Sequence, residues 1–467
     1  MRHLHLAELR DSWPAWLGVC IAFVVTNFAL SLSALALLAG ITFIRSGVVD
    51  ILDSSAYAAE PVFNTLFCLV VGAVVIGYST SLVVDSRRGS LARLALTGAT
   101  PGQVVSTIMS QLAVVSLACS VVGGGLSFVA LAPTLRLLAT DRGDLPSPEP
   151  VYAVWPVLLA GLLAVGLALL GGYRQARRAS RVPPVEALRQ AGGGGREERM
   201  TVTRWLGAAA CLLVISGAYA VTSQLTADPS GDLVSSLIQG GMCLLLAAAL
   251  LLSLVAPAVV GPLTRSWTGL VPSFDPSWDL ARSTTVAKAA RLTKSVVPVM
   301  MTVGLSFGML AIGQTFQSTL YANGFDVELS GSGPSSMVTL LGLPLLIALA
   351  GGVGSLIMMS KQRDAELALS GIVGTTPAQR LAMPVMEAVV IAVTGALLAV
   401  VMVAVAVGFL AVGFPAAGYE FAFSPSYPTF GLAFALALAV TVGATLLPTL
   451  PSLRRPAPRV IARLVAE

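Results

Sequence analysis

The chain contains the stretch RRGSLARLALTGATPGQV at Arg87–Val104 and a second version of it, RDAELALSGIVGTTPAQR, at Arg363–Arg380. Each copy follows one long apolar run and leads directly into another. Aligned without a gap, the copies share the pairs Arg87/Arg363, Leu91/Leu367, Ala92/Ala368, Gly98/Gly374, Thr100/Thr376, Pro101/Pro377 and Gln103/Gln379. A repeat in this setting predicts two related membrane halves, each with the same short segment between two spans.

The composition requires a membrane. Of the 467 residues, 56% are hydrophobic and only 11% are charged, whereas a soluble protein carries about 25% charged residues. Apolar runs of roughly 18 residues or more need a bilayer to bury them. The runs are continuous, which favours helices over a closed β-barrel, whose strands alternate in hydrophobicity. We therefore predict an all-α polytopic membrane protein.

Ten apolar runs are long enough to span a bilayer. The first is longer than the apolar region of a signal peptide and nine more follow it, so we expect it to stay uncleaved. The runs group as four, two and four, with the two groups of four internally duplicated. They lie at 16–44, 63–84, 105–132, 153–172, 205–223, 236–262, 296–318, 336–359, 381–414 and 429–450.

The loops alternate in charge. All but three of the 28 Lys and Arg residues lie at the N-terminus, at the C-terminus or in every second loop. The remaining loops are rich in Asp and Glu, and their only basic residues are Arg45, Arg136 and Arg142. Under the positive-inside rule, this pattern places both termini in the cytoplasm of a cell-membrane protein. The basic residues suit an anionic lipid surface rather than nucleic acid.

These features divide the chain into six segments. The motif PVEALR at Pro184–Arg189 and the motif PRVIAR at Pro458–Arg463 follow the fourth span of each group, which supports the duplication. The segments are an N-terminal amphipathic interfacial helix (1–15), a first four-helix unit (16–190), a Gly-rich cytoplasmic linker (191–204), two connecting transmembrane helices (205–262), a cytoplasmic basic segment (263–295) and a second four-helix unit (296–467).

The span interiors contain almost no charge. An ion-coupled carrier usually needs ionisable groups near the midplane, where a charge costs at least about 2.5–3.5 kcal/mol. Glu387 is the one candidate, and it lies near one end of the ninth span, where a Glu more often snorkels or contacts another helix. Its repeat partner is Gln111, which cannot carry a proton. A proton- or sodium-coupled carrier is therefore disfavoured.

Catalysis by this chain is also disfavoured. It has no GxxxxGK[ST] motif for nucleotide phosphates, because none of its three lysines follows a glycine. The two histidines, His3 and His5, lie in the N-terminal segment and cannot complete a hydrolase triad. The five cysteines lie in apolar runs without metal-ligand spacing. We expect no enzyme activity, no metal and no cofactor in this chain itself.

Each copy of the repeated stretch predicts a short amphipathic helix, a corner and a new helix that enters the bilayer. Apolar residues alternate with small or polar ones up to Gly98 or Gly374. Thr then serves as the N-cap of the next helix and Pro starts it. Such a helix can receive a push from a soluble partner, or it can be a simple elbow without a partner. The spacing alone favours neither.

The repeated stretch resembles the pattern RxxExxxLRxLGATxxQ of the FtsX-like permease family of ABC transporters. The resemblance covers both four-span units, and the four-two-four order is similar to that of the MacB/BceB-type permeases. The first copy has Ser90 where the family has Glu. The matching positions are Arg363, Glu366, Gly374, Thr376 and Gln379 in the second copy, and Gly98, Ala99, Thr100 and Gln103 after Arg87 in the first.

The resemblance implies the permease subunit of an ABC transporter. It would export or extract a hydrophobic or amphipathic substrate, with ATP and Mg²⁺ bound by a separate cytoplasmic ATPase that acts as a dimer. The alternative is a signalling scaffold that transmits the motion of the ATPase without transport. The residues implied to couple to the ATPase are Arg87, Arg88, Leu91, Gly98, Thr100, Pro101, Gln103, Arg363, Glu366, Leu369, Gly374, Thr376, Pro377 and Gln379. Because the second copy keeps the family's Glu, we expect it to couple more tightly.

Overall fold

The computed structural model describes residues 13–47, 51–87, 96–141, 148–180, 200–224, 232–272, 276–287, 289–325, 334–425 and 427–453. This part of the chain forms twelve α-helices and no strand. Ten of these helices are long and apolar enough to cross a membrane. The prediction of an all-helical polytopic membrane protein with ten spans is therefore confirmed.

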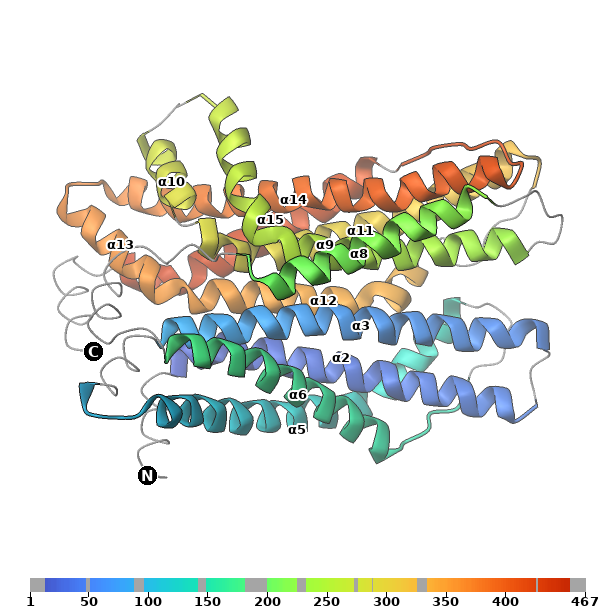
Figure 1. Cartoon of the computed structure of the whole chain (residues 1–467), viewed down its shortest axis with the longest axis horizontal. Coiled ribbons are helices and arrows are strands. Elements are labelled where there is room, and N and C mark those ends of the chain that lie inside the picture. Colours follow the sequence, from blue (N-terminus) through green and yellow to red (C-terminus); the bar gives the residue numbers. More distant parts are fainter. Residues whose placement is uncertain are drawn as a thin grey trace.

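The spans occur in the predicted order of four, two and four, and most of them lie side by side along the long axis of the molecule (Figure 1). The first four are α2 (Trp13–Arg45), α3 (Ile51–Ser86), α5 (Pro101–Asp141) and α6 (Val154–Ala179). Two connecting helices follow, α8 (Val202–Thr222) and α9 (Asp232–Leu270). The second unit contains α11 (Ala289–Ala322), α12 (Pro334–Met358), α14 (Pro377–Ala416) and α15 (Tyr427–Leu453).

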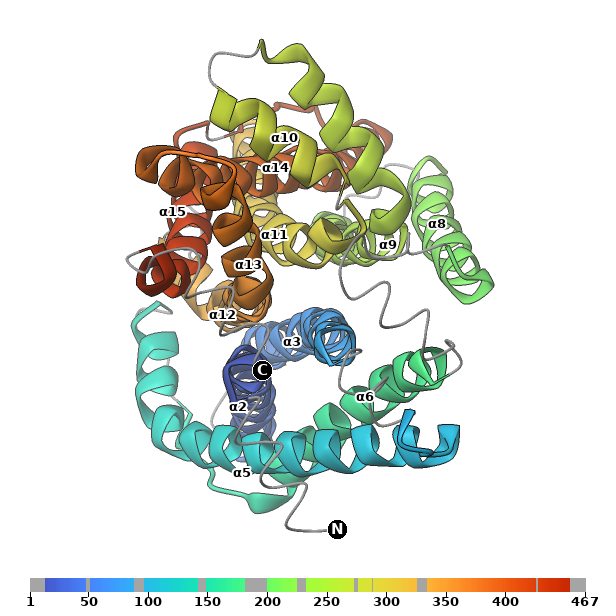
Figure 2. The ribbon, with the colours of Figure 1, turned by 90° about the vertical axis from the view of Figure 1, so that its left-hand side faces the viewer.

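Two shorter helices complete the structure. The first, α10 (Pro276–Ala287), packs against α14, and the second, α13 (Ser360–Ile372), leads from the end of α12 to the start of α14 (Figure 2). We call the end of the bundle that carries α13 the α13 end, and the opposite one the far end. The predicted N-terminal helix falls almost entirely outside the described residues. So do most of the Gly-rich linker and the motifs PVEALR and PRVIAR.

The two four-span units meet where α2 and α3 pack against α12 (Figure 2). Gly18 of α2 and Gly354 of α12 bring the two backbones into direct contact. A Cβ atom on either glycine would lie 2.3 Å from the carbonyl oxygen of the other, so only glycine lets the two backbones touch. The contact brings the first and the eighth span together near the α13 end.

The segment between α9 and α11 is largely helical. The helix α9 extends to Leu270, past the predicted end of the sixth span, and its last part turns away from the bundle (Figure 1). The indole Nε1 of Trp267 donates a hydrogen bond to Thr394 Oγ1 of α14 at 3.0 Å, and its ring lies 6.3 Å from that of Trp278 in α10. These contacts hold α9 and α10 on the outside of α14.

Candidate functional site

Both copies of the repeated stretch turn at a glycine with a left-handed backbone. The φ angle is +95° at Gly98 and +104° at Gly374. Residues with a Cβ atom rarely adopt this conformation. A Cβ added at either position would meet no atom within 4 Å, so the backbone alone, and not crowding, requires glycine there.

The shared Thr-Pro-x-Gln sequence forms a capping box in both copies. The Gln379 amide donates to Thr376 Oγ1 at 3.3 Å, and the Thr376 amide donates to Gln379 Oε1 at 2.9 Å. The Thr100 and Gln103 pair makes the same two bonds, at 3.4 and 2.9 Å. The caps satisfy amides that would otherwise be unpaired at the start of α14 and α5. Thr was predicted as the cap, and the structure adds the role of Gln.

The short helix α13 buries one face and exposes apolar side chains at its tip. Leu367 and Ala368 are buried, whereas Leu369 and Ile372 are exposed and Val373, just after the helix, is 88% exposed. The repeat equivalent of Ile372 in the first copy is Leu96, which is 55% exposed. Arg88 and Leu91 lie outside the described residues. Apolar side chains are thus presented at both corners.

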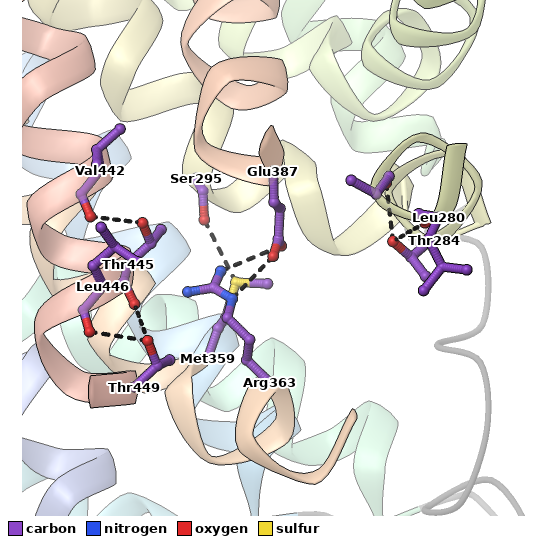
Figure 3. Close-up of polar contacts among 11 residues, drawn as sticks. Leu280, Thr284, Ser295, Met359, Arg363, Glu387, Val442, Thr445, Leu446 and Thr449 are labelled. Carbon is purple, nitrogen blue, oxygen red and sulfur yellow. Dashed lines mark hydrogen bonds and ion pairs between the residues drawn. The ribbon is translucent and has the colours of Figure 1, made fainter. Parts of the chain in front are cut away.

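An arginine ties α13 to the span that follows it. Arg363, only 5% exposed, donates from Nε to Glu387 Oε2 at 2.9 Å and from Nη2 to Glu387 Oε1 at 3.2 Å (Figure 3). This two-point geometry suits an arginine–carboxylate pair. Glu387 therefore contacts another helix as an ion-pair partner, which is one of the two alternatives that the sequence left open for it.

The first unit repeats this contact with a neutral acceptor. Arg87, which is buried, donates from Nη1 to Gln111 Oε1, and the two residues are 24 apart in the chain, as are Arg363 and Glu387. The guanidinium carbon of Arg87 also lies 5.6 Å from the ring centroid of Trp16 in α2. The shared arginine of the repeat thus has the same function in both halves, which is to reach the next span.

A buried lysine connects the two units at the same end. Lys294 of α11 is 4% exposed, and its Nζ donates to Ser81 Oγ of α3 at 2.6 Å and pairs with the carboxylate of Asp85. The helices α3 and α11 otherwise touch little. The sequence places Lys294 only in a basic segment, because sequence spacing does not reveal a partner more than 200 residues away.

The site residues therefore fall into two equivalent groups rather than one cluster. Each group consists of a buried arginine, a left-handed glycine and a capping box, which together set how a short segment enters the next span. Glu366 and Leu369 lie on the exposed side of α13. Among the described residues, no group of three or more His, Cys, Asp and Glu side chains lies close enough to hold a metal.

The family model of the FtsX-like permease C-terminal domain matches two regions of the sequence, residues 62–184 and 355–457. The chain contains two FtsX-like permease units. Each match begins before a corner and includes the buried arginine, the capping box and the two spans that follow. Permeases of this family are membrane subunits of ABC transporters and generally act with an ABC ATPase. No individual curated protein matches the chain.

Proposed function

We propose that this FtsX-like permease exports or extracts a hydrophobic or amphipathic substrate from a cell membrane, driven by a separate ABC ATPase dimer that binds ATP and Mg²⁺. The observation that carries the proposal is the buried arginine contact, which occurs in both units at the end of the bundle where the corners lie. A partner that pushes on a corner would move the attached span with it.

The corners suit the transmission of force. The capping box fixes the first turn of α14. Arg363 of α13 holds Glu387, which lies a few turns further along α14. A push on the exposed tip of α13 would therefore displace α14 rather than bend the corner. Lys294 would pass part of the movement to Asp85 in the first unit. Both corners face the cytoplasm in the topology that the loop charges favour.

The exposed apolar side chains offer a contact for the ATPase. Leu96 and Ile372 occupy equivalent places at the two corners, as two copies of one ATPase subunit would require. An apolar anchor that enters a pocket of a partner supplies much of the affinity of an interface. Asp at these positions should weaken docking without disturbing the buried contacts of the permease.

Co-purification tests the proposal. The full chain, extracted from native membranes in mild detergent, should recover an ATPase of the ABC class, which mass spectrometry identifies. The Leu96→Asp/Ile372→Asp double variant should recover much less of it. Leu270→Asp, which alters an exposed leucine at the end of α9, is the matched control and should recover the normal amount. A pure permease that transports without any ATPase would contradict the proposal.

A further inference from the structure

The helix α11 carries a row of uncharged polar side chains near the far end. Gln314, Gln317, Ser318 and Tyr321 are spaced by three, one and three residues, which puts them on one face of the helix. All four belong to the candidate span Leu292–Ala322. Polar side chains inside a span usually make hydrogen bonds to a neighbouring helix, because lipid offers them no partner.

These four side chains have no such partner among the described residues. They border an open depression of about 400 Å³, completed by Ser424 and Pro425 from the segment before α15. The depression is large enough to admit a small polar group. We call these six residues the α11 polar site.

The wall of the depression is held in place by the end of α11 and the residue that follows it. Asn323 Nδ2 donates to the carbonyl oxygen of Glu420 at 2.9 Å, and the Glu420 amide donates to Asn323 Oδ1 at 2.9 Å. The Ala422 amide donates to Thr319 Oγ1 at 3.3 Å. The segment beside the polar row is thus well anchored, while the row itself has no partner within the part of the chain that the structure describes.

The first unit has no such row. The alignment that pairs Arg87 with Arg363 places Leu38, Ile41, Thr42 and Arg45 of α2 at the equivalent positions. Of these, Thr42 donates its hydroxyl to the carbonyl oxygens of Leu38 and Ala39 in its own helix. Because the equivalent helix does without a polar row, the fold itself does not require one.

We propose that the α11 polar site binds the uncharged, hydrogen-bonding head of an amphiphile whose apolar tail remains in the bilayer. Two amides and the hydroxyls supply both donors and acceptors, which suits a hydroxyl-bearing head. None of the six lining residues is charged, so a charged head would find no counter-ion in the site. The inference rests on the proposed transport function and names the part of the substrate that the permease would recognise.

Photo-crosslinking tests the site. The full chain is reconstituted in dioleoylphosphatidylcholine vesicles without ATP or ATPase. The probe is a monoacylglycerol with a diazirine on the acyl chain near the ester, and the comparison probe is the methyl ester of the same diazirine acid. Mass spectrometry should locate monoacylglycerol adducts within 314–321 or 424–425, at about tenfold the level of the methyl ester, as two neutral hydrogen bonds would produce.

Variants assign the labelling to the glutamines. Gln314→Met/Gln317→Met keeps the length of both side chains and should reduce the monoacylglycerol signal to that of the methyl ester. Gln239→Met changes an exposed glutamine near the start of α9, at the far end of the bundle, and should leave the signal unchanged. Unchanged elution from a size-exclusion column shows that the variants are folded.

Three results would overturn the proposal. They are equal labelling by the two probes, full labelling of the double methionine variant, and displacement of the probe by free glycerol, which would indicate a site for a soluble polyol. Because the assay contains no ATPase, its failure would leave the proposed transport function standing. The absence of an ATPase partner would in turn remove the transport function without affecting the labelling.

Discussion

Arg363 of the short helix α13 donates two hydrogen bonds, of 2.9 and 3.2 Å, to Glu387 in the first half of the next span, α14. The repeat places Arg87 and Gln111 in the same relation in the first unit. The two halves thus share one mechanical connection, with an ionic acceptor in one and a neutral acceptor in the other. An ionic acceptor makes the stronger hydrogen bond.

Removal of Arg363 should loosen the second corner. Arg363→Ala leaves the partly buried Glu387 without its partner, and a lost hydrogen bond to a charged group costs about 1.5–3 kcal/mol. We expect a lower thermal unfolding temperature in detergent and reduced permease-dependent ATP hydrolysis. Glu387→Gln, which copies the first unit, should lose much less. Equal losses from both variants would show that the charge, and not the contact, is what matters.

The left-handed glycines should tolerate only residues that accept a positive φ. Gly374→Val should uncouple ATP hydrolysis from the permease, because the left-handed backbone costs a residue with a Cβ about 1–2 kcal/mol. Gly374→Asn is the control, since Asn adopts this conformation more readily. Because a Cβ would meet open space, insertion into the membrane should be normal in both. Unchanged coupling in Gly374→Val would mean that the corner is only an elbow.

The second capping box should tolerate Glu in place of Gln379 but should be weakened by Leu. Gln379→Leu removes the side chain that accepts from the Thr376 amide, at a cost of about 0.5–2 kcal/mol by analogy with lost N-caps. Gln379→Glu preserves an acceptor at the same place and should remain close to the parent. Unfolding in detergent measures both. Identical destabilisation by Leu and Glu would rule out the capping role.

The bridge between the units should appear as a coupling energy. In a double-mutant cycle, Lys294→Met and Asp85→Asn should each destabilise the protein, and the double variant should lose less than the sum. Residues in direct contact give coupling energies of about 0.5–3 kcal/mol. The measurement is unfolding of the single and double variants. Additive losses would show that the two side chains do not stabilise one another.

The two corners should respond unequally to matched substitutions. Leu96→Asp and Ile372→Asp alter equivalent exposed residues, but only the second corner has the ionic Arg363–Glu387 contact behind it. We expect Ile372→Asp to reduce permease-dependent ATP hydrolysis more than Leu96→Asp does. Steady-state hydrolysis at saturating ATP measures the difference. Losses of equal size would refute the asymmetry.

The sequence by itself determined the ten spans, their four-two-four order and the duplicated corners. Lipid offers the backbone no hydrogen bonds, so long apolar runs must become helices wherever they occur. The Gly and the Thr-Pro pair act on their immediate neighbours, and local signals of this kind can be read without knowledge of the fold.

Only the tertiary structure decided which polar groups meet. The sequence allowed Glu387 either to snorkel or to contact another helix, and it placed Lys294 only in a basic segment. The structure shows both as partners of side chains on other helices. The shared spacing of Arg363 and Glu387 with Arg87 and Gln111 was the one signal that could have revealed the first contact. That the polar row on α11 borders an open depression is likewise visible only once the neighbouring segment is in place. Helix packing brings such groups together across long stretches of chain, and hydrophobic periodicity carries no information about that pairing.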